Sequence, residues 1–273
     1  MAYFIGQGDT VQLSYIVKTL NAKLYAIDGV TTNSEVKIPN AEVVNYWVKS
    51  KGTSTKSTQP GARQEFDPKA LIKKSVTVDS SQQLNGVIPG VNVATVSADA
   101  VNAYVVEDTI EAANEINRDF LRKVEAKAGE AVTVTGASSA DLQDADKVYG
   151  AILKLRAEFI KLNKKDHIVP TAAFVSPLVM AALKTKNLVI YKDNSPYGTF
   201  LEMTIIEAPD LTCDVVMLNQ LAMVSGIAFN AVKTFDGSYL GYADGVAYIG
   251  EIAYVNAATE MSEDFTGKLV LKV

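Results

Sequence analysis

The sequence has few of the residues from which catalytic and metal sites are usually built. Its 273 residues include one cysteine, Cys213, and one histidine, His167. A single cysteine cannot form an internal disulfide, and a thiolate metal cluster needs several cysteines. The composition therefore excludes a disulfide-stapled domain and a zinc–thiolate site, and it fits folding in a reducing cytoplasm.

Long apolar runs and a basic excess are also lacking. No apolar stretch approaches the length that crosses a bilayer, and the first seven residues do not have the pattern of a secretory signal. We therefore expect no membrane partner. The 26 basic and 31 acidic residues give a net charge of −5, which argues against a dedicated nucleic-acid binder. A protein that only encloses nucleic acid remains compatible with this charge.

The chain is nevertheless rich enough in apolar residues to fold. Hydrophobic residues make up 48% of it, an ordinary globular value, and its length suits one large domain or two small ones. Residues 1–35 are predicted to be a weakly structured arm. The arm contains one short amphipathic helix between Val11 and Leu24, followed by the loop signal Thr31-Thr32-Asn33-Ser34.

An extended basic hairpin is predicted next. Apolar residues at 36–48 and 66–78 mark two strands, and the polar stretch 51–61 lies between them. Residues 49–74 include seven basic and two acidic residues, a net charge of +5, so the rest of the chain carries −10. A basic projection on an acidic body favours contact with another copy of that body. Lysines that solubilise an exposed loop and protect its strand edges explain the pattern equally well.

Six residues of this hairpin are candidates for contact between subunits. Two of them are large aromatic residues, which an isolated projection cannot bury and which are enriched at protein interfaces. Burial at the base of the hairpin is the alternative for both aromatics. The six candidates are Tyr46, Trp47, Lys49, Lys51, Lys56 and Arg63.

The strongest periodic signal covers residues 97–128. Apolar residues recur there at helical spacing, acidic residues lie toward the start and basic residues toward the end, as the helix dipole favours. Such a helix would be roughly 45–50 Å long at 1.5 Å per residue. We infer that it spans a flat or elongated protein, because it exceeds what one compact core needs.

Shorter elements are predicted for the second half of the chain. A helix is expected at 142–163, and a further helix begins at Ser176-Pro177, where proline suits the first helical position. The dipeptide Asp236-Gly237 predicts a hairpin turn. Strands are expected at 131–135, 168–175, 188–191, 200–207, 213–218, 227–234 and 238–241, with a short helix at 219–224 and a long final strand at 246–256.

One set of residues could in principle form a catalytic triad. His167 would have to act with Asp166 and Ser176, but no serine lies in a Gly-x-Ser-x-Gly turn. The pattern favours a polar histidine at a strand edge, and we predict no catalytic residue. The alternative of a soluble α/β enzyme that uses His167 stays open at this point, since triads are recognised by geometry.

Metal and cofactor sites are not predicted either. Asp141, Asp144 and Asp146 lack the glycine turn and distal glutamate of a calcium loop, and acids at a helix N-terminus explain them more simply. Gly6-Gln7-Gly8 lacks the third glycine and the preceding strand of a dinucleotide site. We therefore expect neither a metal ion nor a cofactor.

The order of these elements resembles the major capsid proteins of tailed bacteriophages, which have the Hong Kong 97-type fold. The resemblance includes Ile38-Pro39 before the hairpin, the stretch 167–177 (HIVPTAAFVSP), the stretch 200–209 (FLEMTIIEAP) and Asn219-Gln220-Leu221-Ala222. It covers nearly the whole chain. It rests on architecture, because the family has no fixed signature.

The resemblance implies an α+β fold with five named parts. These would be an N-terminal arm at 1–35, the E-loop hairpin and its base at 36–90, a P-domain at 91–164 with a spine helix at 97–128, an A-domain at 165–240, and a return to the P-domain and the C-terminus at 241–273. Some family members carry a long N-terminal scaffolding segment. The short arm here predicts a separate scaffolding protein, or none.

The resemblance also implies a structural role and no enzymatic activity. Copies would form the hexamers and pentamers of an icosahedral shell that encloses phage double-stranded DNA without sequence specificity. The implied partners are other copies of the chain, a scaffolding protein, a portal and decoration proteins. The implied location is the virion, after assembly in the host cytoplasm. An encapsulin, a nanocompartment with the same fold that holds cargo protein, is the closest alternative.

Overall fold

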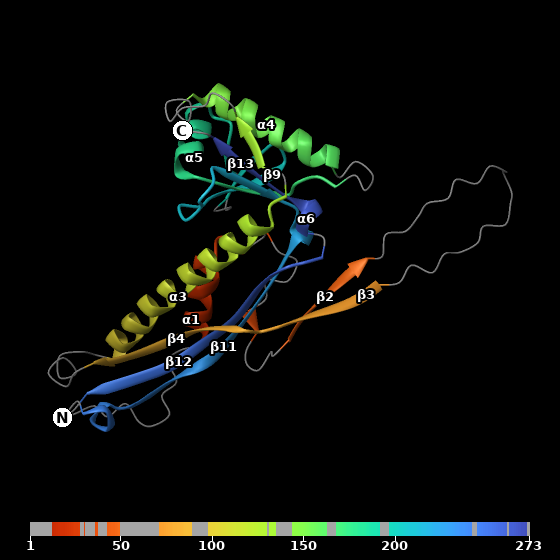
Figure 1. Ribbon diagram of the computed structural model, residues 1–273. Coiled ribbons are helices and arrows are strands. Elements are labelled where there is room, and N and C mark those ends of the chain that lie inside the picture. The colour runs from red at the N-terminus through yellow and green to blue at the C-terminus, as the bar shows by residue number, and fades with distance from the viewer. Residues whose placement is uncertain are drawn as a thin grey trace.

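The described part of the chain forms two bodies and a projection. The computed structural model describes residues 13–27, 30, 36–37, 43–49, 71–88, 98–129, 131–134, 144–162, 168–191, 197–241, 245–260 and 262–271. A long helix lies on an elongated sheet in the lower body, a second sheet with two helices forms the upper body, and a two-stranded hairpin points away from both (Figure 1).

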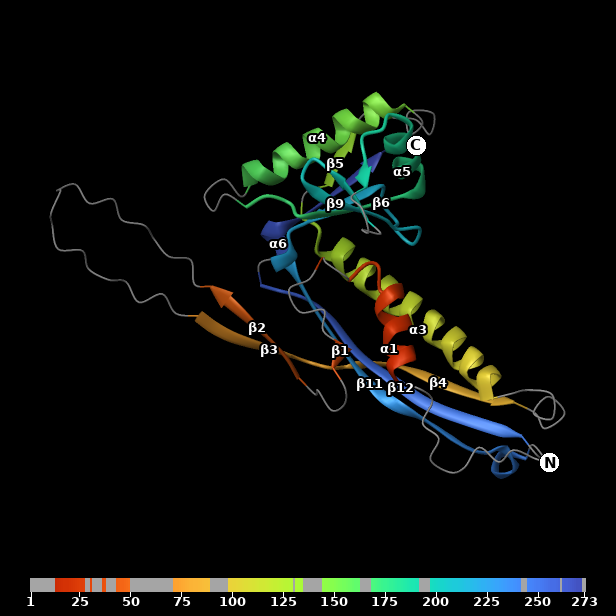
Figure 2. The ribbon, with the colours of Figure 1, turned by 180° about the vertical axis from the view of Figure 1, so that it is seen from behind.

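The lower body is built on a four-stranded sheet. Its strand order is β1 (Val36–Lys37), β11 (Met223–Asp236), β12 (Val246–Ala258) and β4 (Ser80–Ile88). β12 is antiparallel to both β11 and β4, whereas β1 is parallel to β11. Helix α3 (Ala98–Lys127) crosses one face of this sheet, with α1 (Leu13–Lys23) beside it (Figure 2).

Helix α3 confirms the helix that the periodicity predicts at 97–128. It has 30 residues, which corresponds to about 45 Å. Its apolar stripe faces the sheet and α1, so Val105, Ile116 and Phe120 have no solvent exposure. Complete burial of one such side chain contributes about 1.5–3 kcal/mol. Packing of this face, and not helix propensity alone, therefore holds the helix in place.

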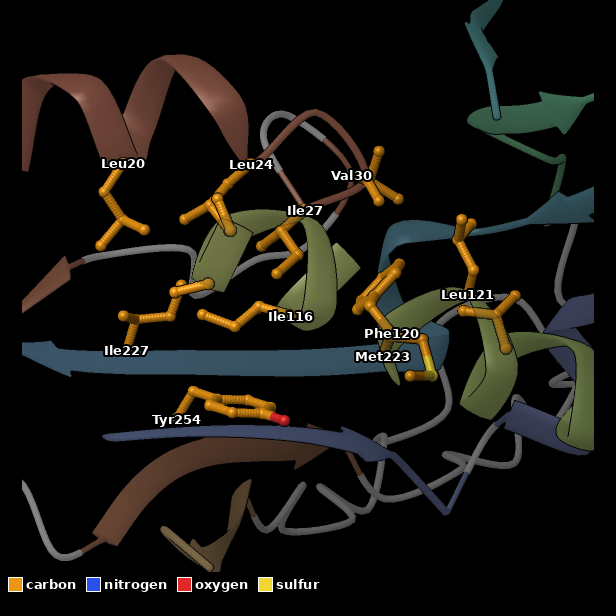
Figure 3. Close-up of a cluster of buried hydrophobic side chains, with 14 of the residues drawn as sticks. Leu20, Leu24, Ile27, Val30, Ile116, Phe120, Leu121, Met223, Ile227 and Tyr254 are labelled. Atoms are coloured by element: carbon orange, nitrogen blue, oxygen red, sulfur yellow. The ribbon is translucent and has the colours of Figure 1, made fainter. Parts of the chain in front are cut away.

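The short helix predicted between Val11 and Leu24 is confirmed as α1, but the prediction that this segment is weakly structured is wrong for residues 13–27. The side chains of Leu20, Leu24 and Ile27 are almost fully buried, and Val30 follows them into the same core. Figure 3 shows these side chains pointing toward Ile116 of α3, with β11 and β12 on its other side. The cause is tertiary: an amphipathic helix this short is marginal alone, and α3 supplies the surface that it buries.

The upper body has a seven-stranded sheet. Its order is β5 (Ala131–Val134), β13 (Thr266–Leu271), β10 (Val215–Leu218), β6 (Ala172–Val175), β9 (Met203–Glu207), β8 (Gly198–Phe200) and β7 (Ile190–Tyr191). Helices α4 (Ala145–Leu162) and α5 (Pro177–Thr185) contribute to a separate apolar cluster on this sheet. Both helices lie within about three residues of their predicted bounds.

The expected division of the chain does not coincide with the two bodies. β5 and α4 precede residue 165 and β13 follows residue 240, yet all three lie in the upper body. The expectation that 246–256 is the final strand is wrong, because α6 (Ser262–Phe265) and β13 follow it. β13 reaches the upper sheet by pairing with β10, about 50 residues earlier, which no local pattern can indicate.

Two turns also differ from the prediction. The expected single strand at 200–207 is the hairpin β8–β9, turned at Leu201 and Glu202, whose φ angles are 50° and 66°. Neither residue normally favours positive φ. The expected hairpin turn at Asp236-Gly237 is wrong: β11 continues to Asp236, and the 3₁₀ helix η3 (Gly237–Leu240) precedes β12. The short helix expected at 219–224 is the 3₁₀ helix η2 (Gln220–Ala222).

We predict that Asn117→Ala destabilises the fold by about 2–3 kcal/mol. The buried Asn117 side chain accepts a hydrogen bond from the amide of Ala26 (3.3 Å) and donates one to the carbonyl of Lys23 (2.9 Å). Alanine would leave both backbone groups without a partner. Urea unfolding of the full chain measures the loss. Asn114→Ala, on the exposed face of the same helix, should change stability by less than about 0.5 kcal/mol.

Candidate assembly surface

The projection is the two-stranded hairpin of β2 (Val43–Lys49) and β3 (Leu71–Thr77). The strands are antiparallel, with Val43 opposite Thr77 and Lys49 opposite Leu71. Only Val78 and Asp79 separate β3 from β4, so the hairpin continues directly from the sheet of the lower body. Figures 1 and 2 show it extending away from α3 and from both sheets.

Two contacts attach the base of the hairpin to the lower body. Val44 of β2 lies against Gly226 of β11, where a Cβ atom would be only 2.2 Å from a methyl carbon of Val44, so the approach requires glycine. Lys74 Nζ lies 2.7 Å from a carboxylate oxygen of Glu260. The hydrogen bond to Glu260 raises the pKa of Lys74. Both side chains are largely exposed to solvent, so the ion pair contributes little to stability. Its main effect is to hold the base of the hairpin in one orientation relative to the lower body.

The candidate contact residues fall into two groups. Tyr46 and Trp47 occupy neighbouring positions in β2, opposite Lys74 and Lys73 respectively, and Tyr46 is partly buried. Lys49 is the last residue of β2. The structure thus brings three of the six candidates onto one strand. The remaining three, Lys51, Lys56 and Arg63, lie outside the described residues.

A polar hollow beside α3 was not identified from the sequence. Its volume is about 590 Å³. The signal that could have found it is a row of acidic residues on α3 at spacings of three and four, which places them on one face of a helix. The lining residues are Gln82, Gln83 and Asn85 of β4, and Asp108, Glu111, Ala112, Asn114, Glu115 and Arg118 of α3.

The carboxylates of this hollow have different surroundings. Asp108 accepts a hydrogen bond of 2.7 Å from the hydroxyl of Tyr248, and burial together with Asp108 raises the pKa of that hydroxyl. Glu115 pairs with Arg118, which also contacts Asp210 at 3.1 Å. Glu111 is exposed and forms no ion pair with any described residue. The hollow therefore presents excess negative charge to solvent.

The residues considered for catalysis or metal binding do not form a site within the described part of the chain. His167, Asp166 and Asp141 lie outside it. Ser176 occupies the N-cap position of α5. Asp144 accepts a hydrogen bond from the amide of Asp146 at the start of α4, which confirms the interpretation of these two acids as helix N-terminal residues. The described residues include no group of three potential ligands that could hold a metal ion.

No described helix is long and apolar enough to cross a membrane.

The only cysteine, Cys213, is buried beside Glu125, and its thiol lies 3.4 Å from a carboxylate oxygen of that residue. Burial, followed by the charge of Glu125, raises the pKa of Cys213 to about 12. A thiol in these surroundings stays protonated at neutral pH and is a poor nucleophile.

No protein-family model and no curated protein matches the chain. Among solved structures, it resembles the capsid of Cyanophage P-SCSP1u (12% identity, TM-score 0.59, covering 89% of this chain and 87% of that one). It also resembles the mature capsid of bacteriophage PhiM1 (15% identity, TM-score 0.57, covering 90% of this chain and 86% of that one). A third similar structure is the capsid of a native GTA particle (10% identity, TM-score 0.53, covering 92% of this chain and 91% of that one). The α+β fold of phage capsid proteins, inferred from the order of elements, is thereby confirmed.

We predict that Cys213 resists thiol reagents in the folded protein. Because its folded pKa of about 12 lies above the ordinary value of 9.0, the thiol stays neutral across the range below pH 9. Because the folded state disfavours the thiolate, the contribution of Cys213 to the free energy of unfolding is fully present below pH 9. This contribution declines as the pH rises from 9 toward 12. Titration with Ellman's reagent at pH 8 should show no reaction before denaturation. A Lys73→Cys variant, exposed on β3, should react at once.

Proposed function

We propose that the chain is the major capsid protein of a tailed bacteriophage. Copies assemble into hexamers and pentamers, which close into an icosahedral shell around double-stranded DNA. The observation that carries this proposal is the likeness to several phage capsids along about nine-tenths of both chains. A likeness of that extent includes both bodies and is not confined to a common sheet or helix pair.

The parts of the fold have natural roles in such a shell. Helix α3 acts as the spine, β2 and β3 form the E-loop, and the region 1–35 acts as an N-arm whose helix α1 is packed against α3 of its own chain. The lower body, with α3, β4, β11 and β12, is assigned to the P-domain, and the upper body, with β5, α4 and β13, is assigned to the A-domain, in place of the expected bounds 91–164 and 165–240. Each contact between copies is small. Symmetry repeats it, so the assembled shell is stable although single contacts are weak.

The charge distribution suits a container for DNA. Outside residues 49–74 the chain carries −10, so it does not bind the phosphate backbone tightly. The proposed partners are other copies of the chain, a separate scaffolding protein, a portal, decoration proteins and packaged DNA without sequence specificity. Assembly takes place in the host cytoplasm, and the product is the virion capsid.

An encapsulin shell is the second candidate, and one observation favours it. The specific observation is the amphipathic N-terminal helix α1, an element that would line the cargo site of an encapsulin, although Leu20 and Leu24 of α1 are buried against α3 of the same chain. An encapsulin uses the same fold to hold a cargo protein. The contents of the particles distinguish the two functions: nuclease-protected DNA supports a phage capsid, and an enclosed protein without DNA supports an encapsulin.

We predict that the purified full-length protein forms shells, rings or tubes. Negative-stain microscopy and light scattering at several protein concentrations provide the test. A species that remains a monomer of about 29.3 kDa at every concentration would overturn the proposal. The ratio of absorbance at 260 nm to that at 280 nm, measured on native particles after nuclease treatment, then reports whether they enclose nucleic acid.

We also predict that assembly weakens as ionic strength rises, because salt screens attraction between the basic hairpin and the acidic remainder. Replacing Lys49, Lys51 and Lys56 together by glutamine should reduce both assembly and its dependence on salt. A control that removes the same charge elsewhere is Arg122→Gln, Lys154→Gln and Lys233→Gln, all at exposed positions. Equal behaviour of the two triple variants would contradict the electrostatic account while leaving the fold unaffected.

A further inference from the structure

The outward face of α4 is covered by no other described element. Figures 1 and 2 show α4 on the outer side of the upper body, with the seven-stranded sheet and α5 beneath it. The opposite face of the helix is its buried stripe, which consists of Ala145, Val148, Ala151, Ile152, Leu155 and Phe159. A helix face without a partner is ordinarily polar throughout. The outward face of α4 differs from this expectation in three respects.

The first is Gly150, a glycine inside the helix without a reason within its own chain. Glycine weakens a helix interior more than any residue except proline. Elsewhere glycine permits close packing: a Cβ atom at Gly226 or Gly250 would lie 2.2 or 2.6 Å from a valine methyl carbon. At Gly150, no described atom lies within 4 Å of that position. The space that glycine leaves is open to solvent, which indicates that another molecule approaches the helix there.

The second is a pair of apolar side chains on one side of Gly150. Leu153 and Ile160 are separated by seven residues, so they lie in one row about 10 Å apart. Both are half-buried, and neither belongs to the apolar clusters that the described residues form. Ala157, seven residues after Gly150, is exposed and also small. The outward face thus offers a shallow apolar strip with room for a second backbone.

The third is a row of lysines on the other side of Gly150. Lys147, Lys154 and Lys161 are exposed and follow one another at intervals of seven residues, and we call them the lysine row. Lys161 contacts Glu158 at 3.3 Å, whereas Lys154 forms no ion pair with any described residue. A row with this period runs nearly parallel to the helix axis and faces a second helix along its length. Its positive charge selects acidic residues on that helix.

We propose that the outward face of α4 binds an acidic amphipathic helix of another protein. The apolar residues of that helix pack on Leu153 and Ile160. Its backbone approaches α4 at Gly150 and Ala157, and its carboxylates face the lysine row. Small residues at the contact permit a short distance between the two helix axes. This surface gives the chain a partner besides its own copies, and it does not depend on which shell the copies build.

Two other occupants fit this face less well. A second α4, packed antiparallel across a two-fold axis, would bring one lysine row against another, and like charges repel. The phosphate backbone of DNA would be attracted by the lysine row, but it makes no use of Leu153, Ile160 or the open space at Gly150. Glu158, which pairs with Lys161, also lowers the positive charge that DNA would meet.

Binding of a synthetic peptide is the first test. The probe has about three heptads, with leucine at the first and fourth positions and glutamate at the flanking ones. Fluorescence anisotropy measures its affinity for the full-length protein at concentrations below the onset of assembly. At low salt, a peptide with lysine in place of glutamate, and duplex DNA, should each bind at least about tenfold more weakly than the acidic peptide. Equal binding of the two peptides, or tighter binding of DNA, overturns the inference.

A Gly150→Leu variant separates binding from folding. Leucine favours the helix and has open space at this position, so urea unfolding should show a variant at least as stable as the native chain. Its side chain would block the approach of a second helix, and the acidic peptide should bind at least about tenfold more weakly. Unchanged affinity overturns the inference. A loss of stability also overturns it, because Gly150 would then serve the chain itself.

Charge reversal tests the lysine row. Lys154→Glu should weaken binding of the acidic peptide about threefold at low salt and by less at high salt. The matched control is Lys233→Glu, exposed on β11 in the lower body, which should leave the affinity unchanged. Equal effects of the two substitutions would contradict the role of the row.

The result of these measurements is separate from that of the assembly test. Particles formed normally by a chain that does not bind the acidic peptide would overturn this inference and leave the proposed function standing. A chain that binds the peptide through Gly150 and Lys154 but never assembles would overturn the proposed function and support the binding face on α4.

Discussion

The lower body depends on the burial of one helix between two partners. The apolar side chains of α3 pack against β11, β12 and β4 on one side and against α1 on the other (Figure 3). Buried polar contacts then select one position along the helix. Asn256 of β12 donates to the carbonyl of Ile116 (3.2 Å) and to Asp119 (3.1 Å), and it accepts from Ser225 (2.6 Å). Apolar packing supplies the stability, and these directional bonds determine the register.

The end of the same helix connects the two bodies. The Glu125 carboxylate accepts hydrogen bonds from the amide and the hydroxyl of Thr212, at 2.7 and 2.6 Å. Thr266, the first residue of β13, donates to the carbonyl of Lys127 at 2.6 Å. The strand that returns last along the chain thus satisfies a carbonyl at the helix C-terminus, where no partner within the helix is available. These contacts orient the upper body relative to α3.

The charge distribution along the sequence can be interpreted only with the arrangement of the elements in space. From the sequence, seven basic residues between 49 and 74 are equally compatible with a solubilised loop and with an interface. The structure adds a hairpin directed away from its own body and a polar hollow on α3 that contains Asp108, Glu111 and Glu115. A projection directed away from its own body is free of that body over most of its length, which is compatible with the interface interpretation under the proposed function.

The sequence alone determined the elements whose signals lie within their own residues. The apolar period of α3 and α4, and the proline at the start of α5, place these helices to within about three residues, because each signal lies within the element that it predicts. The basic hairpin was also indicated by its composition. The partners of these elements required the tertiary structure. Whether residues 13–30 form an arm or part of the core depends on α3, about 90 residues away, and the assignment of β13 to the upper sheet depends on its pairing with β10. Pairing and burial are relations between distant residues, so only the folded chain decided them.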